Sequence, residues 1–246
     1  MLSRLQQAKL VWPTLSALAA LVLLLGLGTW QVERKRWKED LLAKIAARVA
    51  ADPVPLERAM AVMRASGDVE YTHVSVVGRF LHDKERYLYA PTASGLGWHV
   101  YTPLQIGPDH IVWTNRGFVP DASKDPGARA NGQISGETEV RGVLRLQPHK
   151  TLFTPENDAV HNIWYWADIP ALTRSAWPGA VTAVPVIIEA DVQPAPPGGL
   201  PKGGVTRITL PNRHLEYAIT WYGLALTLIG VYLAFAVNRL RSFPTG

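Results

Sequence analysis

Two apolar stretches decide the fold of this chain: LVWPTLSALAALVLLLGLGTW at residues 10–30 and YAITWYGLALTLIGVYLAFAV at residues 217–237. Each has 21 residues and no charged side chain. A helix rises about 1.5 Å per residue, so each stretch would be roughly 30 Å long, the thickness of a bilayer core. The sequence therefore predicts a membrane protein with two transmembrane helices.

The first stretch has a second interpretation, a cleaved signal peptide. Its apolar run exceeds the roughly 7–15 residues of such a region, and no small-x-small cleavage site follows it before Gln31. Trp12 and Trp30 bracket the run, as aromatic side chains do at membrane interfaces. We therefore expect a retained anchor. The second stretch allows no cleavage interpretation.

The composition agrees with two spans and excludes several classes of protein. Charged residues make up 18% of the chain, against about a quarter in soluble domains. With 48% hydrophobic residues and no cysteine, the chain is neither disordered nor a disulfide scaffold, and it lacks a thiolate zinc site. The net charge of +5 could suggest nucleic acid, but its basic clusters flank the spans. We expect a membrane-lipid partner and no nucleic acid.

These features predict five segments. They are a short tail at residues 1–9, transmembrane helix 1 at 10–30, a β-rich extramembrane domain at 31–213, transmembrane helix 2 at 214–237 and a short tail at 238–246.

Charge gives a divided answer about orientation. The tails carry Arg4, Lys9, Arg239 and Arg241, which favour cytoplasmic termini. The basic run at residues 34–38 follows the first span directly and favours the opposite. Long domains translocate largely regardless of charge, so we expect both termini in the cytoplasm and the central domain outside it.

The central segment begins with helical spacing and continues with strands. Apolar residues recur at helical spacing over 32–49, and a second short helix is expected over 55–64. Candidate strands follow at 69–80, 86–89, 98–106, 110–119, 138–146, 163–168 and 184–191. The predicted fold class is an α+β membrane protein, in which two transmembrane helices flank one mostly antiparallel β domain with N-terminal helices.

Catalytic motifs are absent from the sequence. None of the seven histidines forms an i, i+4 pair or an H-E-x-x-H motif, and there is no G-x-S-x-G, P-loop or G-x-G-x-x-G. We expect that the protein is not an enzyme. Two local patterns have other interpretations. Trp164 and Trp166 are expected in an aromatic core rather than a docking patch, and Gly117 predicts a bulge or a close backbone approach.

A helical wheel separates two faces of the second span. One face holds His214, Ala218, Trp221, Ala225 and Tyr232, with Tyr217 at its edge. The opposite face holds the small residues Gly223, Thr227, Gly230 and Ala234. Small residues let helices approach closely in lipid. We therefore expect the small face to pack on the first span or on a partner, and the aromatic face to look elsewhere.

The aromatic face has two interpretations. His214 could be an axial metal ligand, with Tyr217 and Trp221 as flat walls for a haem macrocycle and Arg213 and Arg207 as cations for its propionates. The same residue types are also ordinary members of a membrane-interface belt, where arginine contacts lipid phosphate. The wheel leaves both interpretations open.

Several fragments, spread over nearly the whole chain, follow one family pattern. They are residues 28–32 (GTWQV) with Arg34, Trp37 and Lys38, then 103–104, 115–120 (NRGFVP), 155–158, 162–168 (NIWYWAD) and 211–222 (PNRHLEYAITWY). This ordered set resembles the SURF1 family of assembly factors for haem-copper cytochrome c oxidase. The chain departs at Phe118, where the family commonly has Trp, and at Arg213 and Glu216, where it usually has uncharged amides.

The resemblance implies a non-enzymatic factor of the respiratory chain that handles haem a or delivers it for insertion into oxidase subunit I. His214 matches the histidine proposed as the family's haem contact. Haem a synthase is the implied upstream partner. The alternative is a cofactor-free scaffold that stabilises a subunit I intermediate. The family's domain faces the periplasm or intermembrane space, and the short first tail favours a bacterial plasma membrane over a mitochondrion.

Overall fold

The computed structural model describes residues 10–92, 95–177, 179, 181–206 and 212–242. The chain forms two compact units. The first contains Met1–Lys44 and Thr209–Gly246, and the second contains Ile45–Ile208. The predicted fold class is confirmed, because two long apolar helices near the termini flank a central β-rich domain.

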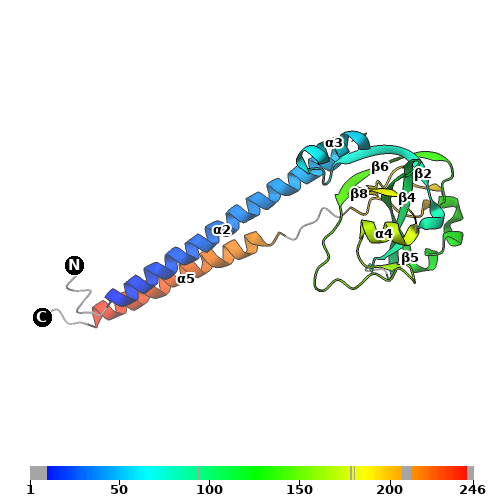
Figure 1. Ribbon diagram of the computed structural model, residues 1–246. Helices are drawn as coiled ribbons and strands as arrows, with labels where there is room; N and C mark the ends of the chain where they lie inside the picture. The colour runs from blue at the N-terminus through cyan, green and yellow to red at the C-terminus, as the bar shows by residue number, and fades with distance from the viewer. Residues whose placement is uncertain (1–9, 93–94, 178, 180, 207–211, 243–246) are drawn as a thin grey trace. The chain divides into compact units, whose positions relative to one another are not determined.

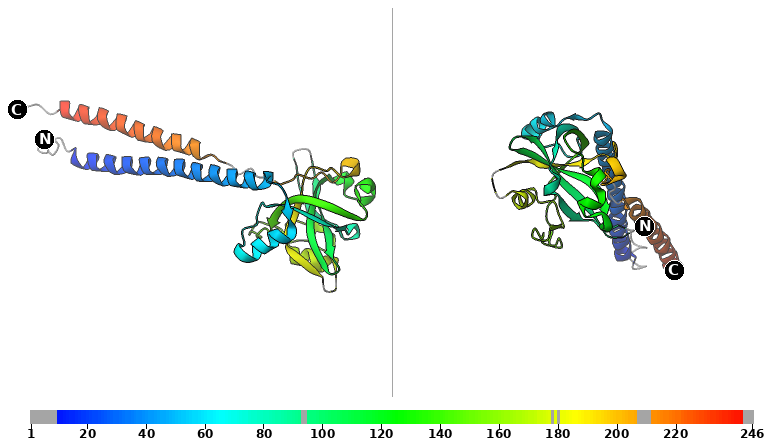
Figure 2. Two further views of the ribbon diagram at one scale, coloured as in Figure 1. Left: turned by 90° about the horizontal axis from the view of Figure 1, so that it is seen from above. Right: turned by 90° about the vertical axis from the view of Figure 1, so that its right-hand side faces the viewer.

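The first unit is built from two helices, which lie side by side in Figures 1 and 2. They are α5 (His214–Arg241) and the part of α2 (Val11–Ala50) that precedes Ile45. Both are long and apolar enough to cross a membrane. Only 6% and 11% of their most apolar windows are buried, whereas the core helix of a soluble protein is mostly buried. α2 passes Trp30 without a break, so the helix expected over 32–49 is continuous with the first span. The segment boundaries at 30 and 213 stay predictions.

The second unit is a curled sheet with short helices. Its strands are β1 (Val54–Pro55), β2 (His73–Phe80), β3 (Arg86–Tyr89), β4 (Gly97–Gly107), β5 (His110–Pro120), β6 (Glu137–Leu146), β7 (Ile163–Trp164) and β8 (Thr182–Ala190). Their order in the sheet is β1-β2-β6-β8-β5-β4-β3-β7. Pairing is mostly antiparallel, as expected, and β1–β2, β3–β7 and β5–β8 are parallel.

The sheet closes on itself because β2 pairs with both β6 and β4. The strands β2, β6, β8, β5 and β4 thereby form a small barrel. Gly78 lies where β2 meets β4, and a Cβ atom there would be 2.4 Å from the Gln105 carbonyl oxygen. A residue without a side chain therefore allows the closing pair to form.

The barrel is filled by alternate residues of its strands. The buried set is Val74, Val76, Phe80, Leu104, Val112, Val140, Leu144, Val186 and Ile188. Leu56 and Ala59 of α3 (Leu56–Ser66) pack into the same cluster, and Gly67 ends this helix in the left-handed conformation. The helix expected over 55–64 is therefore present.

A second apolar cluster covers the outside of the barrel. It joins α4 (Ile169–Ala176) to Trp113, Ile187 and Trp164, and Figure 1 shows α4 lying against these strands. Trp164 is fully buried and its Nε1 donates to Asn162 Oδ1 at 2.9 Å. The aromatic-core interpretation of Trp164 is confirmed.

The expected strand at 163–168 is wrong beyond Trp164, because residues 165–168 leave the sheet and lead into α4, which begins at Ile169. The Asp168 side chain accepts a hydrogen bond from the Ala171 backbone N–H at 3.0 Å and caps α4, with Pro170 in the first turn. The cap outweighs the strand tendency of the preceding aromatic residues. The strand expected over 69–80 begins only at His73, since Tyr71 has a left-handed φ of 64°.

Gly117 makes the close backbone approach that the sequence predicts. Its φ is +119°, and a Cβ atom there would lie 2.0 Å from the Lys202 carbonyl oxygen. Phe118 and Lys202 exchange two backbone hydrogen bonds of 2.9 Å at this point. The segment after β8 is thereby pinned to β5, and Pro120 ends the strand.

We expect Gly117→Ala to lower the free energy of unfolding of the β domain by more than about 2 kcal/mol, because the added methyl displaces a paired backbone. Gly136→Ala is the matched control. Its φ is +82°, but a Cβ atom at this position would have no other atom within 4 Å. It should cost only the backbone strain, about 1 kcal/mol. Thermal unfolding of the full chain in nanodiscs, followed by tryptophan fluorescence, measures both, and equal losses would contradict the steric argument.

Candidate functional site

The residues named by the helical wheel lie at the start of α5. Arg213 occupies the N-cap position without a side-chain capping bond, and His214 is the first helical residue. His214 and Trp221 are partly buried, while Arg213 and Tyr217 are exposed. Arg207 lies outside the described residues.

His214 is held by the other helix. Its Nδ1 lies 2.7 Å from Oε1 of Gln31 on α2, and Gln31 is only 9% exposed. His214 Nε2 has no hydrogen-bond partner among the residues that the structure describes. One ring nitrogen is therefore engaged by protein and the other is open.

Two further polar contacts join α2 to α5. Thr29 Oγ1 lies 3.2 Å from the Tyr222 hydroxyl, and Thr14 forms a short hydrogen bond with Tyr232. Together with the Gln31–His214 contact, these contacts pair rising residue numbers on α2 with falling ones on α5. The two helices are therefore antiparallel. Gly28 completes the contact, because a Cβ atom there would be 2.8 Å from the Tyr222 ring. The fragment at residues 28–31 is therefore the α2 side of this site.

The expectation that the small face of α5 packs on the first span is wrong. Gly223 and Gly230 have no atom within 4 Å of a Cβ position, whereas Ala218 and Ala225, on the face of His214, are each 2% exposed. The aromatic face turns to α2, where His214 and Tyr232 find hydrogen-bond partners. Such pairing favours this face because hydrocarbon offers polar groups no water as an alternative. Packing of the small face on a partner stays a prediction.

Arg213 and Trp221 are placed differently with respect to His214. Arg213 Nε donates to Glu216 Oε2 at 3.1 Å in an exposed ion pair, which contributes little to stability. Trp221 Nε1 is buried and has no acceptor among the described residues. No hydrogen bond or ring contact within the described part of the chain joins His214 to Arg213, Tyr217 or Trp221. No three His, Cys, Asp or Glu side chains of the described residues gather as a metal site.

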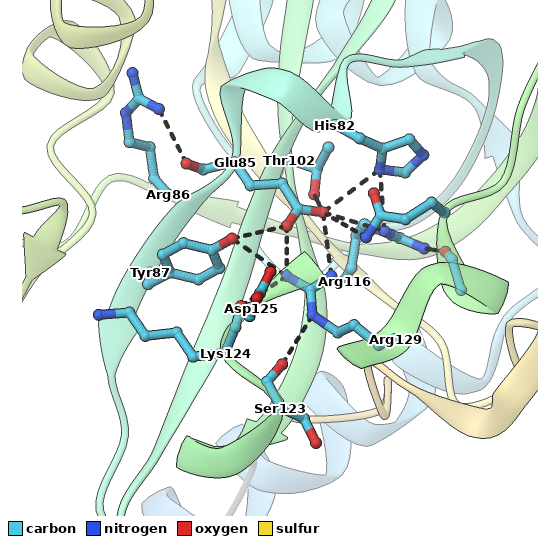
Figure 3. Close-up of polar contacts among 12 residues, drawn as sticks. His82, Glu85, Arg86, Tyr87, Thr102, Arg116, Ser123, Lys124, Asp125 and Arg129 are labelled. Carbon is cyan, nitrogen blue, oxygen red and sulfur yellow. Dashed lines mark hydrogen bonds and ion pairs between the residues drawn. The ribbon is translucent and has the colours of Figure 1, made fainter. Parts of the chain in front are cut away.

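The β domain holds a buried charged cluster that sequence reasoning missed (Figure 3). Glu85, directly before β3, is 4% exposed. Its Oε2 accepts from Arg129 Nη2 at 2.5 Å and from the Tyr87 hydroxyl at 3.1 Å, and its Oε1 accepts from Thr102 at 3.3 Å and Arg116 at 3.4 Å. These partners come from β3, β4, β5 and the 3-10 helix at Pro126–Gly132.

The cluster holds its carboxylate ionised. Burial acts to raise the pKa of Glu85, but hydrogen bonds from His82 and Arg129 and the charges of Arg129 and Arg116 outweigh it and lower that pKa to about 2. Burial lowers the pKa of Arg116 to about 10. Because every oxygen of Glu85 is engaged and its proton is lost far below neutral pH, the cluster is suited to hold elements together and unsuited to general-acid work. Arg116, from the NRGFVP fragment, extends it by donating to the Gly132 carbonyl.

A family model described as the SURF1 family matches residues 18–226. The chain belongs to the SURF1 family. The resemblance seen in the sequence is thereby confirmed, and the matched range of this SURF1 family member includes both Gln31 and His214 as well as the Glu85 cluster.

Relatives of this SURF1 family member include proteins of three distantly related eukaryotes. A SURF1-like protein of Monosiga brevicollis is 36% identical over 224 residues, covering 86% of this chain and 83% of the relative. Surfeit locus protein 1 of Homo sapiens is 39% identical over 217 residues, covering 81% and 69%. A SURF1-like protein of Drosophila melanogaster is 32% identical over 233 residues, covering 87% and 74%.

We expect Glu85→Gln to destabilise the β domain at neutral pH by about 3 kcal/mol, because two buried guanidinium groups lose their counter-charge. The pKa of Glu85 is lowered in the fold, from 4.5 to about 2. Its contribution is therefore full above about pH 4.5 and is lost as the pH falls through about 2. The gap in unfolding free energy between wild type and variant should narrow over that range.

Chemical denaturation of the full chain at several pH values measures this gap. The control is Glu137→Gln, which changes an exposed carboxylate at the start of β6. A gap for Glu85→Gln that stays constant from pH 7 to about pH 2 would contradict the assignment.

Proposed function

We propose that this chain is an assembly factor for haem-copper cytochrome c oxidase that holds haem a, or delivers it, for insertion into subunit I. Membership of the SURF1 family supports the oxidase role. The observation that carries the haem role is the imidazole of His214, whose Nδ1 is bonded to Gln31 while Nε2 has no partner among the described residues.

The polar atoms at this end of α5 fit such a group. Besides His214 Nε2, the buried atoms Trp221 Nε1 and Asn212 Oδ1 have no hydrogen-bond partner among the described residues. Buried polar groups are normally hydrogen-bonded. Unpaired polar atoms at this helix end therefore favour a bound molecule as their partner. An imidazole, aromatic rings and a nearby guanidinium together make up a donor set that suits haem.

Each residue then has a distinct task. His214 would supply one axial nitrogen, and Tyr217 and Trp221 would offer aromatic surface. Arg213 would reach a propionate by leaving Glu216, an exchange between exposed ion pairs that costs little. When bound, haem would supply a redox-active iron that His214 would hold. A single protein ligand on an accessible helix end suits a factor that must also release its cargo.

The remaining parts of the proposal concern partners and location. Haem a synthase would supply the cofactor and oxidase subunit I would receive it. The basic residues Arg239 and Arg241 at the end of α5 favour termini in the cytoplasm and a β domain on the opposite side of the membrane. Assignment to a bacterial plasma membrane, with the domain in the periplasm, and the absence of enzymatic activity stay predictions.

We expect His214→Ala to lose haem a that co-purifies with the full chain, together with the axial-ligand features of its absorption spectrum, because the variant removes the iron-binding nitrogen. The cells must make haem a. The control is His161→Ala, which removes an exposed imidazole paired with Asp158 in the β domain. Unchanged haem content and an unchanged spectrum in His214→Ala would contradict the assignment of His214 as haem ligand.

The cofactor-free scaffold has an observation of its own. The face of α5 with Gly223, Thr227, Gly230 and Ala234 is exposed, and its glycines have open space around them. Such a face suits close packing against another membrane helix. On this alternative, haem binding is irrelevant and the helix face associates with subunit I.

We expect the double variant Gly223→Leu/Gly230→Leu to lose co-purification with oxidase subunit I if the scaffold role holds, because the bulkier side chains keep the helices apart. Leucine is a good helix former, so α5 should persist. Phe235→Leu, at an exposed apolar position of the same helix, is the control. Intact association of the double variant would count against the scaffold.

A further inference from the structure

Gln31 is a buried polar residue whose side chain points to a histidine. It is 9% exposed, and its Oε1 lies 2.7 Å from His214 Nδ1 across the two helices. A side-chain amide oxygen only accepts hydrogen bonds. His214 Nδ1 must therefore carry the proton in this contact, and the lone pair of the neutral ring then lies on Nε2.

The choice of tautomer decides which atom of the ring is able to bind a metal. A neutral imidazole has one N–H, and a metal binds the nitrogen that lacks it. Histidine ligands usually donate their other N–H to a carbonyl or carboxylate, which fixes the ring and raises its basicity. Gln31 offers that acceptor, and its own burial limits the access of water that would compete for the bond.

The neighbouring residues of α2 keep Gln31 in register with His214. Gly28 admits the ring of Tyr222, and Thr29 Oγ1 lies 3.2 Å from the Tyr222 hydroxyl. These contacts lie within one helical turn of Gln31, on the same pair of helices. A tight contact so close to the amide limits sliding of α2 along α5.

We propose that Gln31 is a positioning residue: its side-chain carbonyl holds His214 in the Nδ1–H tautomer and thereby presents Nε2 as the metal-binding atom. The part of this inference that concerns haem rests on the proposed function. The assignment of the His214 tautomer does not depend on that function, and the tautomer is measurable in the protein without haem.

The first experiment reads the tautomer by nitrogen-15 NMR of the full chain, labelled at histidine and kept in nanodiscs without haem. The signal of His214 is identified by its loss in His214→Ala. We expect Nδ1–H in the wild type, mixed tautomers in Gln31→Leu and a restored Nδ1–H in Gln31→Glu, since a carboxylate also accepts. A wild-type ring protonated on Nε2, or an Nδ1–H ring that persists in Gln31→Leu, would overturn the proposal.

The second experiment measures the affinity of the same proteins for haem a by titration and records the spectrum of the complex. Loss of a bond to a ligating histidine typically weakens metal binding 10–100-fold, so Gln31→Leu should bind about that much more weakly than wild type. Gln31→Glu should keep the affinity and lower the midpoint potential of the haem, because the ligand becomes more basic.

Thr220→Ala is the matched control, because it removes an exposed hydroxyl of α5 that donates to the Glu216 backbone carbonyl and contacts neither Gln31 nor His214. Equal haem affinity of Gln31→Leu and wild type would overturn the positioning role. If His214→Ala kept its haem and its spectrum, the assignment of His214 as ligand in the proposed function would fail. The tautomer measured in haem-free wild type and Gln31→Leu would still test the role of Gln31.

Discussion

The hydrocarbon core of a membrane offers no hydrogen bonds, and the arrangement of the two long helices follows from that constraint. Gln31, Thr29 and Thr14 on α2 each find a partner on α5, respectively His214, Tyr222 and Tyr232. These pairs select which face of α5 turns inward. They also place an imidazole at the helix end with one nitrogen engaged, so the candidate site depends on the same contacts that join the helices.

The β domain also contains buried polar groups that need partners, and these groups are charged. Its barrel is filled by aliphatic side chains, but beside β3 it buries a carboxylate and two guanidinium groups. Burying such ions is costly unless each is paired and hydrogen-bonded. Glu85 meets that condition with partners from several strands and a 3-10 helix, so the cluster ties the irregular segment at residues 126–132 to the sheet. The NRGFVP fragment thereby has a structural task through Arg116 and Gly117.

The sequence-based expectations succeed where a local pattern carries the information. The strand expected at 86–89 and the helix expected over 32–49 are present because period and composition specify them. They fail where a competing interaction decides. Asp168 caps a helix in place of a strand, and hydrogen bonds turn the aromatic face of α5, not its small face, toward α2. His214 was identified from its sequence neighbours, whereas its partner Gln31 was not.

The sequence by itself determined two apolar spans, a strand-rich domain between them and a family resemblance carried by ordered fragments. Only the tertiary structure decided that Gln31 meets His214, 183 residues away, and that Glu85 meets Arg116 and Arg129, 31 and 44 residues away. Such pairs produce no periodic pattern in the sequence, because a hydrogen bond depends on where two side chains meet in space. The two spans, in contrast, are predictable from local hydropathy, because insertion of a segment into a membrane depends on the length and polarity of that segment alone.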